Sequence, residues 1–209
     1  MSKVIAIAGC VGRIGTTTQA IQMIKLIQEN NMTACYLENN KSNYLKQMVD
    51  LYCGVEDKGS HLKYQGIDFY KRNMIKKIPK DKYDYLIRDY GSASADAFEE
   101  NSFAEQPVKI IVCGSKPNEI FQAQELLMDP IHDDCYFVFS FVPKQEEISI
   151  YSMMGKRAEK TFFTGCIYDP FHLEPESNKI YPLIIKRSFM PKKGESYGNK
   201  IYTGSSDQN

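Results

Sequence analysis

The stretch Gly9–Thr18 reads GCVGRIGTTT, and the fold is decided there. An apolar run, KVIAIA, precedes it, and a run with helical spacing, QAIQMIKLIQ, follows it. Gly9, Gly12 and Gly15 allow a backbone turn to come close to a ligand, and the free N–H groups at the start of a helix attract an anion. This order of strand, glycine loop and helix predicts a phosphate-binding loop.

Length and charge narrow the class of protein. A chain of 209 residues is long enough for one domain with a full hydrophobic core. Its formal net charge is zero, so the basic excess of a dedicated nucleic-acid binder is missing. No apolar run approaches the roughly 20 residues that a membrane span needs, and the N-terminus lacks the pattern of a signal peptide. We therefore expect a cytoplasmic protein that does not associate with membranes.

Apolar runs alternate with helical patterns along the chain. The runs have the continuous apolar character of strands covered on both faces: Lys3–Ala8, Thr33–Leu37, Tyr85–Asp89, Val108–Cys113, Cys135–Val142 and Thr161–Tyr168. Helical patterns lie between them: Thr17–Asn30, Ser42–Tyr52, Ala95–Glu105, Asn118–Met128 and Gln145–Lys160. The alternation predicts an α/β fold with a doubly wound, mostly parallel sheet flanked by helices.

Three segments depart from this alternation. His61–Tyr70 predicts two short strands around a turn at Gln65 and Gly66. Asn178–Arg187 predicts a last strand, and Pro182 restricts it to a sheet edge. The remaining residues are polar and rich in Gly, Ser and Asn, which predicts a domain over 1–190 and a loose tail over 191–209.

The glycine loop resembles the deviant Walker A loop of the ParA/MinD-like ATPases, which are P-loop NTPases of the SIMIBI class. That loop reads Lys-Gly-Gly-x-Gly-Lys-Thr-Thr, and Gly12, Gly15, Thr17 and Thr18 match it. The resemblance implies a doubly wound fold that binds ATP or ADP. It also implies that the Thr17 hydroxyl holds Mg²⁺ and that Thr18 touches the α-phosphate.

Three positions of the loop differ from this pattern. Val11 replaces the signature lysine, Arg13 replaces a glycine, and Thr16 replaces the phosphate-binding lysine. A charged hydrogen bond is worth about 1.5–3 kcal/mol, so its loss weakens phosphate binding by about ten- to a hundred-fold. Hydrolysis loses more, because the lysine also stabilises charge that develops in the transition state. We therefore expect weak or absent ATP hydrolysis.

Arg13 is the one cation left in the loop. It either compensates by reaching phosphate or a dimer interface, or it points to solvent. The predicted nucleotide-binding residues are those of the loop and the first turn of the helix: Gly12, Arg13, Ile14, Gly15, Thr16, Thr17 and Thr18.

Two carboxylates are candidates for the chemistry of the site. In KYDYLIRDYGS, a predicted strand ends on Asp89, and Gly91 follows. This resembles the second nucleotide motif of the family, in which a strand-end Asp orients Mg²⁺ through water. In CYLENNKSN, Glu38 and Asn40 stand where relatives often place Asp-x-Asp. We predict Asp89 and Glu38 as catalytic residues and Thr17 and Asp89 as the metal site; the alternative for Glu38 is a polar turn residue.

Cysteines and histidines give little support to other chemistry. No pair of the six cysteines has Cys-x-x-Cys spacing, and Cys35, Cys113, Cys135 and Cys166 lie in apolar runs, which predicts buried thiols. The three histidines, His61, His132 and His172, lack metal-ligand spacing and are expected at the surface or in turns.

Three functions remain open. In the first, a ParA/MinD-like protein binds nucleotide, hydrolyses it weakly or not at all, and uses its nucleotide state to control a homodimer or a protein partner. In the second, a pseudo-ATPase serves as an interaction module without nucleotide. In the third, the same fold acts as a small-molecule ligase or kinase. Basic clusters at Lys71–Lys82 and Lys186–Lys193 offer positive charge to DNA. Because such clusters more often only face solvent, DNA is a possible partner but not a favoured one.

Overall fold

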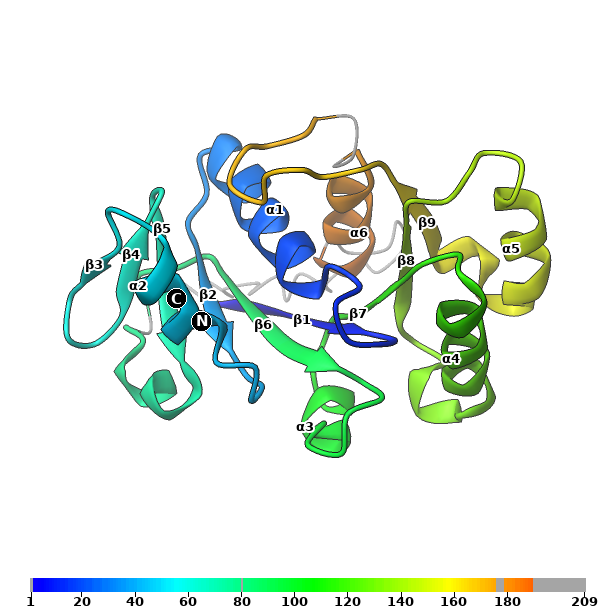
Figure 1. Ribbon diagram of the computed structural model, residues 1–209, viewed down its shortest axis with the longest axis horizontal. Helices are drawn as coiled ribbons and strands as arrows, with labels where there is room; N and C mark the ends of the chain where they lie inside the picture. The colour runs from blue at the N-terminus through cyan, green and yellow to red at the C-terminus, as the bar shows by residue number, and fades with distance from the viewer. Residues whose placement is uncertain (1, 80, 176–178, 190–209) are drawn as a thin grey trace, which may run out of the picture.

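The computed structural model describes residues 2–79, 81–175 and 179–189 (Figure 1). Within these residues the strands are β1 Lys3–Gly9, β2 Ala34–Glu38, β3 Glu56–Asp57, β4 Leu62–Tyr64, β5 Ile67–Lys71, β6 Tyr85–Ser92, β7 Lys109–Cys113, β8 Tyr136–Ser140 and β9 Thr161–Thr164. The α-helices are α1 Thr16–Glu29, α2 Tyr44–Leu51, α3 Glu100–Ala104, α4 Pro117–Met128, α5 Glu147–Met154 and α6 Ile180–Phe189. Three 3-10 segments complete the list: η1 Arg72–Lys77, η2 Pro130–His132 and η3 Gly155–Lys160.

All the strands of the described residues join one sheet in the order β3-β4-β5-β2-β6-β1-β7-β8-β9. From β5 to β9 every neighbouring pair is parallel, whereas β3, β4 and β5 pair antiparallel. The chain leaves β1 toward β2 on one side and later builds β7, β8 and β9 on the other. The carboxyl ends of β1 and β6 therefore meet where the winding reverses, which is where open α/β sheets bind ligands.

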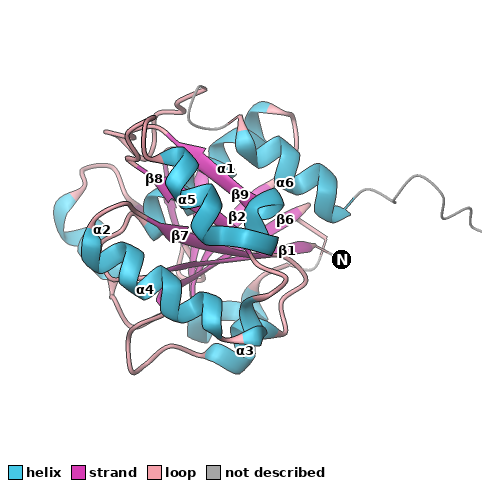
Figure 2. Cartoon of the chain, turned by 90° about the vertical axis from the view of Figure 1, so that its right-hand side faces the viewer, coloured by secondary structure: helices cyan, strands magenta, loops and turns pink. Residues whose placement is uncertain are grey.

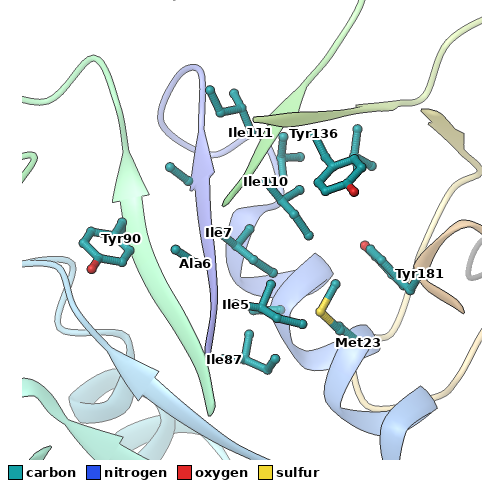
Figure 3. Packing of buried hydrophobic residues seen from close by; sticks show 14 of the residues in the cluster. Ile5, Ala6, Ile7, Met23, Ile87, Tyr90, Ile110, Ile111, Tyr136 and Tyr181 are labelled. Carbon is teal, nitrogen blue, oxygen red and sulfur yellow. The ribbon is translucent and has the colours of Figure 1, made fainter. Parts of the chain in front are cut away.

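Helices cover both faces of the sheet, with α1 and α6 on one side and α3 and α4 on the other (Figures 1 and 2). Side chains alternate between these two layers. Ile5 and Ile7 of β1 point toward α1, where Met23 lies, whereas Ala6 faces away from it (Figure 3). In the parallel register Ile7 pairs with Asp89 of β6, so the Asp89 side chain also faces α1. The predicted α/β fold is confirmed, and this alternation positions the candidate site.

The predicted hairpin over 61–70 is confirmed as β4 and β5. Gln65 and Gly66 form its two-residue turn with positive φ angles of 48° and 79°. The short strand β3, which the sequence analysis does not predict, extends the sheet beyond this hairpin and consists of two exposed acidic residues.

The predicted edge strand near the C-terminal end is wrong, because residues 180–189 form helix α6. Tyr181 and Ile184 are buried three residues apart, which is helical spacing. Pro182 lies in the first turn, where backbone N–H groups have no acceptor within the helix, so the absence of an N–H at proline removes no helical hydrogen bond. Asn178 and the predicted tail over 191–209 lie outside the described residues.

Several elements are shorter than predicted. Helix α3 begins at Glu100 rather than Ala95, α5 ends at Met154 rather than Lys160, β8 ends at Ser140 rather than Val142, and β9 ends at Thr164 rather than Tyr168. Two of these ends coincide with left-handed backbone, at Gly155 with φ 52° and at Phe141 with φ 60°. A residue with that conformation continues neither a helix nor a strand.

One prediction of exposure is wrong. Cys166 is exposed, because β9 ends before it, whereas Cys35, Cys113 and Cys135 are buried as predicted. His132, expected at the surface or in a turn, lies in the 3-10 turn η2, and it is only 2% exposed because this turn packs against the core beside Phe103. No helix among the described residues has the length and apolar character needed to cross a membrane.

Truncating α6 on each of its faces tests its helical character. We expect Ile184→Ala to lower the free energy of unfolding by about 2–5 kcal/mol, because it empties a buried site. Leu183→Ala is the matched control and changes it by less than about 0.5 kcal/mol, because Leu183 is 47% exposed. Urea denaturation measures both. An edge strand would place residues 181, 183 and 185 on one face, so a larger effect at Leu183 would contradict the helix.

Candidate nucleotide-binding site

The loop between β1 and α1 is an open turn anchored at its β1 end. The Cys10 N–H donates to the Val112 carbonyl at 2.8 Å, and the Gly9 carbonyl accepts from the Ala93 N–H at 2.7 Å. Between these anchors and α1, Arg13 and Gly15 have left-handed backbones, with φ of 62° and 93°. The loop therefore curls without a regular hydrogen-bond pattern of its own.

Backbone N–H groups in this turn remain available to a ligand. Among the described residues, those of residues 12–18 have no hydrogen-bond acceptor, and the Gln19 N–H, which donates to the Gly15 carbonyl at 2.9 Å, is the next to be paired. Free N–H groups at the start of a helix form an anion site. They border a cavity of about 620 Å³, a volume typical of small-ligand sites.

Three segments line this cavity. They are the loop and first turn of α1, the residues after β2, and the chain at and after the end of β6: Val11, Gly12, Arg13, Gly15, Thr16, Thr17, Thr18, Asn40, Lys41, Ser42, Tyr90, Gly91, Ser92, Ala95, Ala97 and Phe98. Of the predicted nucleotide-binding residues, Ile14 alone does not line it; its side chain is buried and packs in the core.

Thr17 and Asp89 are brought together as the resemblance implies. The Thr17 hydroxyl donates to Asp89 Oδ2 at 2.6 Å, and the Tyr36 hydroxyl donates to the same oxygen at 2.7 Å. On the other oxygen, Oδ1 accepts from the Gly91 N–H at 2.8 Å and from Asn40 Nδ2 at 3.2 Å. Asp89 is fully buried, and this burial raises the pKa of its carboxyl, while the hydrogen bonds from Thr17 and Tyr36 oppose the shift.

This geometry fits a magnesium ion bound through Thr17. The Thr17 hydroxyl donates its hydrogen bond to Asp89, so the lone pairs of its oxygen remain for a metal on the cavity side. Both oxygens of Asp89 already accept hydrogen bonds, so this carboxylate would act on a metal through Thr17 or through water. Mg²⁺ keeps several waters and takes few protein oxygens, which agrees with this donor set.

Thr16, which the sequence analysis aligns with the phosphate-binding lysine of the ParA/MinD-like loop, brings no charge to the site. Its side chain is 8% exposed and packs against Gly9, where an added Cβ would overlap the Thr16 hydroxyl. The cationic side chains that line the cavity are Arg13 and Lys41, both exposed. Lys41 was not predicted, because it stands in a polar turn without a motif. It lines the cavity because β2, which precedes this turn, pairs with β6 in the sheet.

Glu38 is engaged elsewhere. Its Oε1 accepts from the Leu45 N–H at 3.2 Å and from the Ser42 hydroxyl at 3.5 Å, which satisfies the start of α2. It lines an adjoining cavity of about 470 Å³, together with Lys46 and Lys71, instead of the loop cavity. Burial raises the pKa of Glu38, and the hydrogen bond from Leu45 opposes this. A catalytic role for Glu38 stays a prediction.

An aromatic wall was also missed by the sequence analysis. Tyr90 and Phe98 line the loop cavity, with ring centroids 6.4 Å apart in an edge-to-face arrangement. The Tyr90 hydroxyl donates to the Ser102 carbonyl at 3.0 Å, which fixes the ring. Phe98 lies in the segment that was predicted as helix and is found as turns, so no periodic pattern marks it.

Comparisons with known proteins identify the fold. No protein-family profile matches the sequence, and no curated protein does. Among solved structures, a plasmid partition protein from Borrelia burgdorferi bound to AMPPNP is 14% identical, with 88% of this chain and 97% of that chain covered and a TM-score of 0.57. The MinD cell division protein of Aquifex aeolicus is 12% identical, with 88% and 86% covered and a TM-score of 0.58.

A third structure, a ParA family ATPase from Chlorobium tepidum TLS, is 13% identical, with 90% and 93% of the chains covered and a TM-score of 0.52. Along nearly its whole length, the chain therefore has the fold of the ParA/MinD-type P-loop ATPases, which confirms the fold that the loop predicts. At these identities the likeness establishes the fold, and function has to be argued from the residues of the site.

Gly9→Ala tests how tightly the loop packs. The new Cβ would lie 2.9 Å from the Val11 carbonyl oxygen and overlap the side chains of Thr16 and Ile14, so we expect a loss of about 1–3 kcal/mol in the free energy of unfolding. At Gly12 nothing lies within 4 Å of an added Cβ, so Gly12→Ala is the control and stays within about 0.5 kcal/mol. Equal stabilities of the two variants without nucleotide would refute the packing.

Asp89→Asn tests the buried carboxylate through the pH dependence of stability. The folded carboxyl keeps its proton to higher pH than the unfolded one, whose ordinary pKa is 3.8. Between these pKa values the folded state binds more protons, so the wild-type free energy of unfolding falls as pH rises. We expect the stability of Asp89→Asn relative to wild type to increase as pH rises above 3.8 and then level off.

The matched control for this measurement is Asp84→Asn. Hydrogen bonds from the Thr33 N–H and hydroxyl lower the pKa of Asp84, so its contribution to stability is complete above the ordinary value of 3.8. Urea denaturation from pH 4 to 8 should therefore show no slope in the difference between Asp84→Asn and wild type. A flat difference for Asp89→Asn as well would contradict the raised pKa.

Proposed function

We propose that the chain binds ATP or ADP with Mg²⁺ in the loop cavity and hydrolyses ATP slowly or not at all. The observation that carries the proposal is the hydrogen bond from Thr17 to the buried Asp89, next to a loop whose N–H groups are free. Nucleotide binding by the similar Borrelia burgdorferi protein, whose structure contains AMPPNP, supports the choice of ligand.

Each part of such a ligand has a matching group in the cavity. The backbone N–H groups of residues 12–18 would receive the phosphates, and Thr17 and Asp89 would hold Mg²⁺. Arg13 and Lys41 would supply positive charge. Their side chains are exposed, so their contribution is screened by salt far more than that of a lysine anchored within the loop. Tyr90 and Phe98 offer an apolar wall for a planar group.

Hydrolysis is expected to be slow, because the groups that favour it are missing or engaged. Thr16 carries no charge, Glu38 is engaged at the start of α2, and Asn40 cannot act as a general base. Under this proposal, the nucleotide state controls a homodimer or a protein partner. A structure of the Aquifex aeolicus MinC:MinD complex, which the chain also resembles with a TM-score of 0.54 at 11% identity, supports a role in protein contacts.

A small-molecule ligase or kinase is the second candidate, and one observation favours it. The adjoining cavity contains Lys46, Lys71 and Arg72 and shares Asn40 with the loop cavity. A second, anionic substrate in that cavity would lie beside the phosphates of a bound nucleotide. Phosphoryl transfer depends on the missing lysine more strongly than nucleotide binding does, so the ligase or kinase is the second candidate.

Calorimetry with ATP and Mg²⁺ tests the proposed function. Wild type should bind, Thr16→Lys should bind about ten- to a hundred-fold more tightly because it restores a charged hydrogen bond, and Arg13→Ala should bind more weakly. Lys25→Ala, a change at the lysine that contacts the Gln65 carbonyl away from the cavity, is the control. Sedimentation of the same samples with AMPPNP then measures dimerisation.

The alternatives predict different outcomes of these measurements. Absence of binding by both wild type and Thr16→Lys would overturn the proposal in favour of an interaction module without nucleotide. Equal affinities of wild type and Arg13→Ala would remove the compensating role of Arg13. Phosphate release by wild type above that of Asp89→Asn, when small anionic substrates are added, would favour the ligase or kinase.

A further inference from the structure

Three side chains that are far apart in the sequence meet beside α3 and α4, outside the loop cavity. Glu100 begins α3, Asp129 follows α4, and His132 ends η2. One possible ligand atom from each lies within 4.8 Å of the other two. All three line a cavity of about 330 Å³, and the rest of its wall is formed by Ala93, Ser94, Gln122, Glu125 and Leu126.

His132 is buried without a hydrogen-bond partner. It is 2% exposed, and among the described residues its Nδ1 has no partner. Its Nε2 lies 3.9 Å from Glu100 Oε1, which is too far for a direct hydrogen bond. Buried polar groups are rarely left unpaired in folded proteins, because the loss of hydration is not compensated. Nε2, the ring nitrogen nearer Glu100, is the atom that a cation shared with the two carboxylates would contact.

The charge of the cavity points to a cation. A neutral imidazole has a lone pair on one ring nitrogen that it can donate to a metal ion. Glu100, Glu125 and Asp129 give the wall three carboxylates, while no lysine or arginine lines it. Asp129 Oδ1 accepts from the Ile131 N–H at 3.0 Å, which fixes this side chain and leaves Oδ2 for a ligand.

We propose that Glu100, Asp129 and His132 bind a Zn²⁺ ion. Zinc takes imidazole nitrogen and carboxylate oxygen at about 2.0–2.2 Å in a tetrahedral arrangement, so two ligands of one ion lie about 3.3–3.6 Å apart. The 3.9 Å between His132 Nε2 and Glu100 Oε1 is slightly longer than this, and rotations of the exposed Glu100 and Asp129 side chains would close the gap. Mg²⁺ and Ca²⁺ prefer sites of oxygen alone, whereas an imidazole beside two carboxylates suits a transition metal such as zinc. Water from the cavity would take the fourth position.

The proposed ion would act on the segment that follows Asp89. It would tie the start of α3 to η2, and the cavity wall between them includes Ala93, whose N–H donates to the Gly9 carbonyl at 2.7 Å. The site shares no lining residue with the loop cavity. The zinc proposal therefore stands or falls independently of the nucleotide proposal.

Zinc binding to the full chain is measured by calorimetry with ZnCl₂ alone, after treatment with EDTA and without nucleotide. We expect one high-affinity ion per chain. Glu100→Gln and Asp129→Asn should each weaken binding by about tenfold or more, and the double variant should lose it. Both side chains are exposed, so these variants keep the fold. NMR of the His132 ring, expected to shift with zinc while His61 and His172 do not, is the second readout.

Two controls separate this site from other zinc binding. His61→Ala removes the histidine that lies 3.4 Å from Asp68, the other histidine–carboxylate contact, and should keep full zinc affinity. Asp89→Asn should keep it as well, because Asp89 belongs to the proposed magnesium site. A wild type that binds zinc no better than the Glu100→Gln, Asp129→Asn double variant would overturn the proposal. So would a wild type in which zinc leaves the His132 ring signals unchanged.

Discussion

The hydrogen bond between Thr17 and the buried carboxylate of Asp89 is the interaction on which the site depends. A fully buried charge is tolerated only where donors replace its hydration, and Asp89 receives four of them. These donors come from α1, from β2, from the turn after β2 and from the end of β6. One side chain therefore fixes the relative positions of every segment that lines the loop cavity.

The strand, glycine loop and helix at the start of the chain were predicted correctly. They are neighbours in the sequence, so spacing and backbone chemistry alone identify them. Asp89 was singled out because it ends an apolar run and because the residues around it resemble the second nucleotide motif of the ParA/MinD-like ATPases. Its hydrogen bond with Thr17 comes from the parallel pairing of β1 and β6, which the structure shows.

Features that depend on contacts between distant segments were missed. Lys41 reaches the loop cavity because β2 lies beside β6, and no local pattern encodes that neighbourhood. His132 and Glu100 are 32 positions apart, so no motif spacing connects them, and the polar turn around His132 hides its burial. One miss has a local cause instead. The segment that forms α6 was read as a strand because a short apolar run fits both a strand and a helix, and Pro182 is compatible with the first turn of a helix.

The two acidic residues of β3 protect one side of the sheet from self-association. An unpaired strand edge can accept a strand from another molecule, and natural proteins prevent this with short edge strands and charged side chains. Here the edge consists only of Glu56 and Asp57, both exposed, so a second molecule would meet charged side chains after two residues. Glu56 also pairs with Lys58, so a strand added at this edge would have to displace or bury an ion pair. The short charged edge therefore offers little to a strand from another molecule.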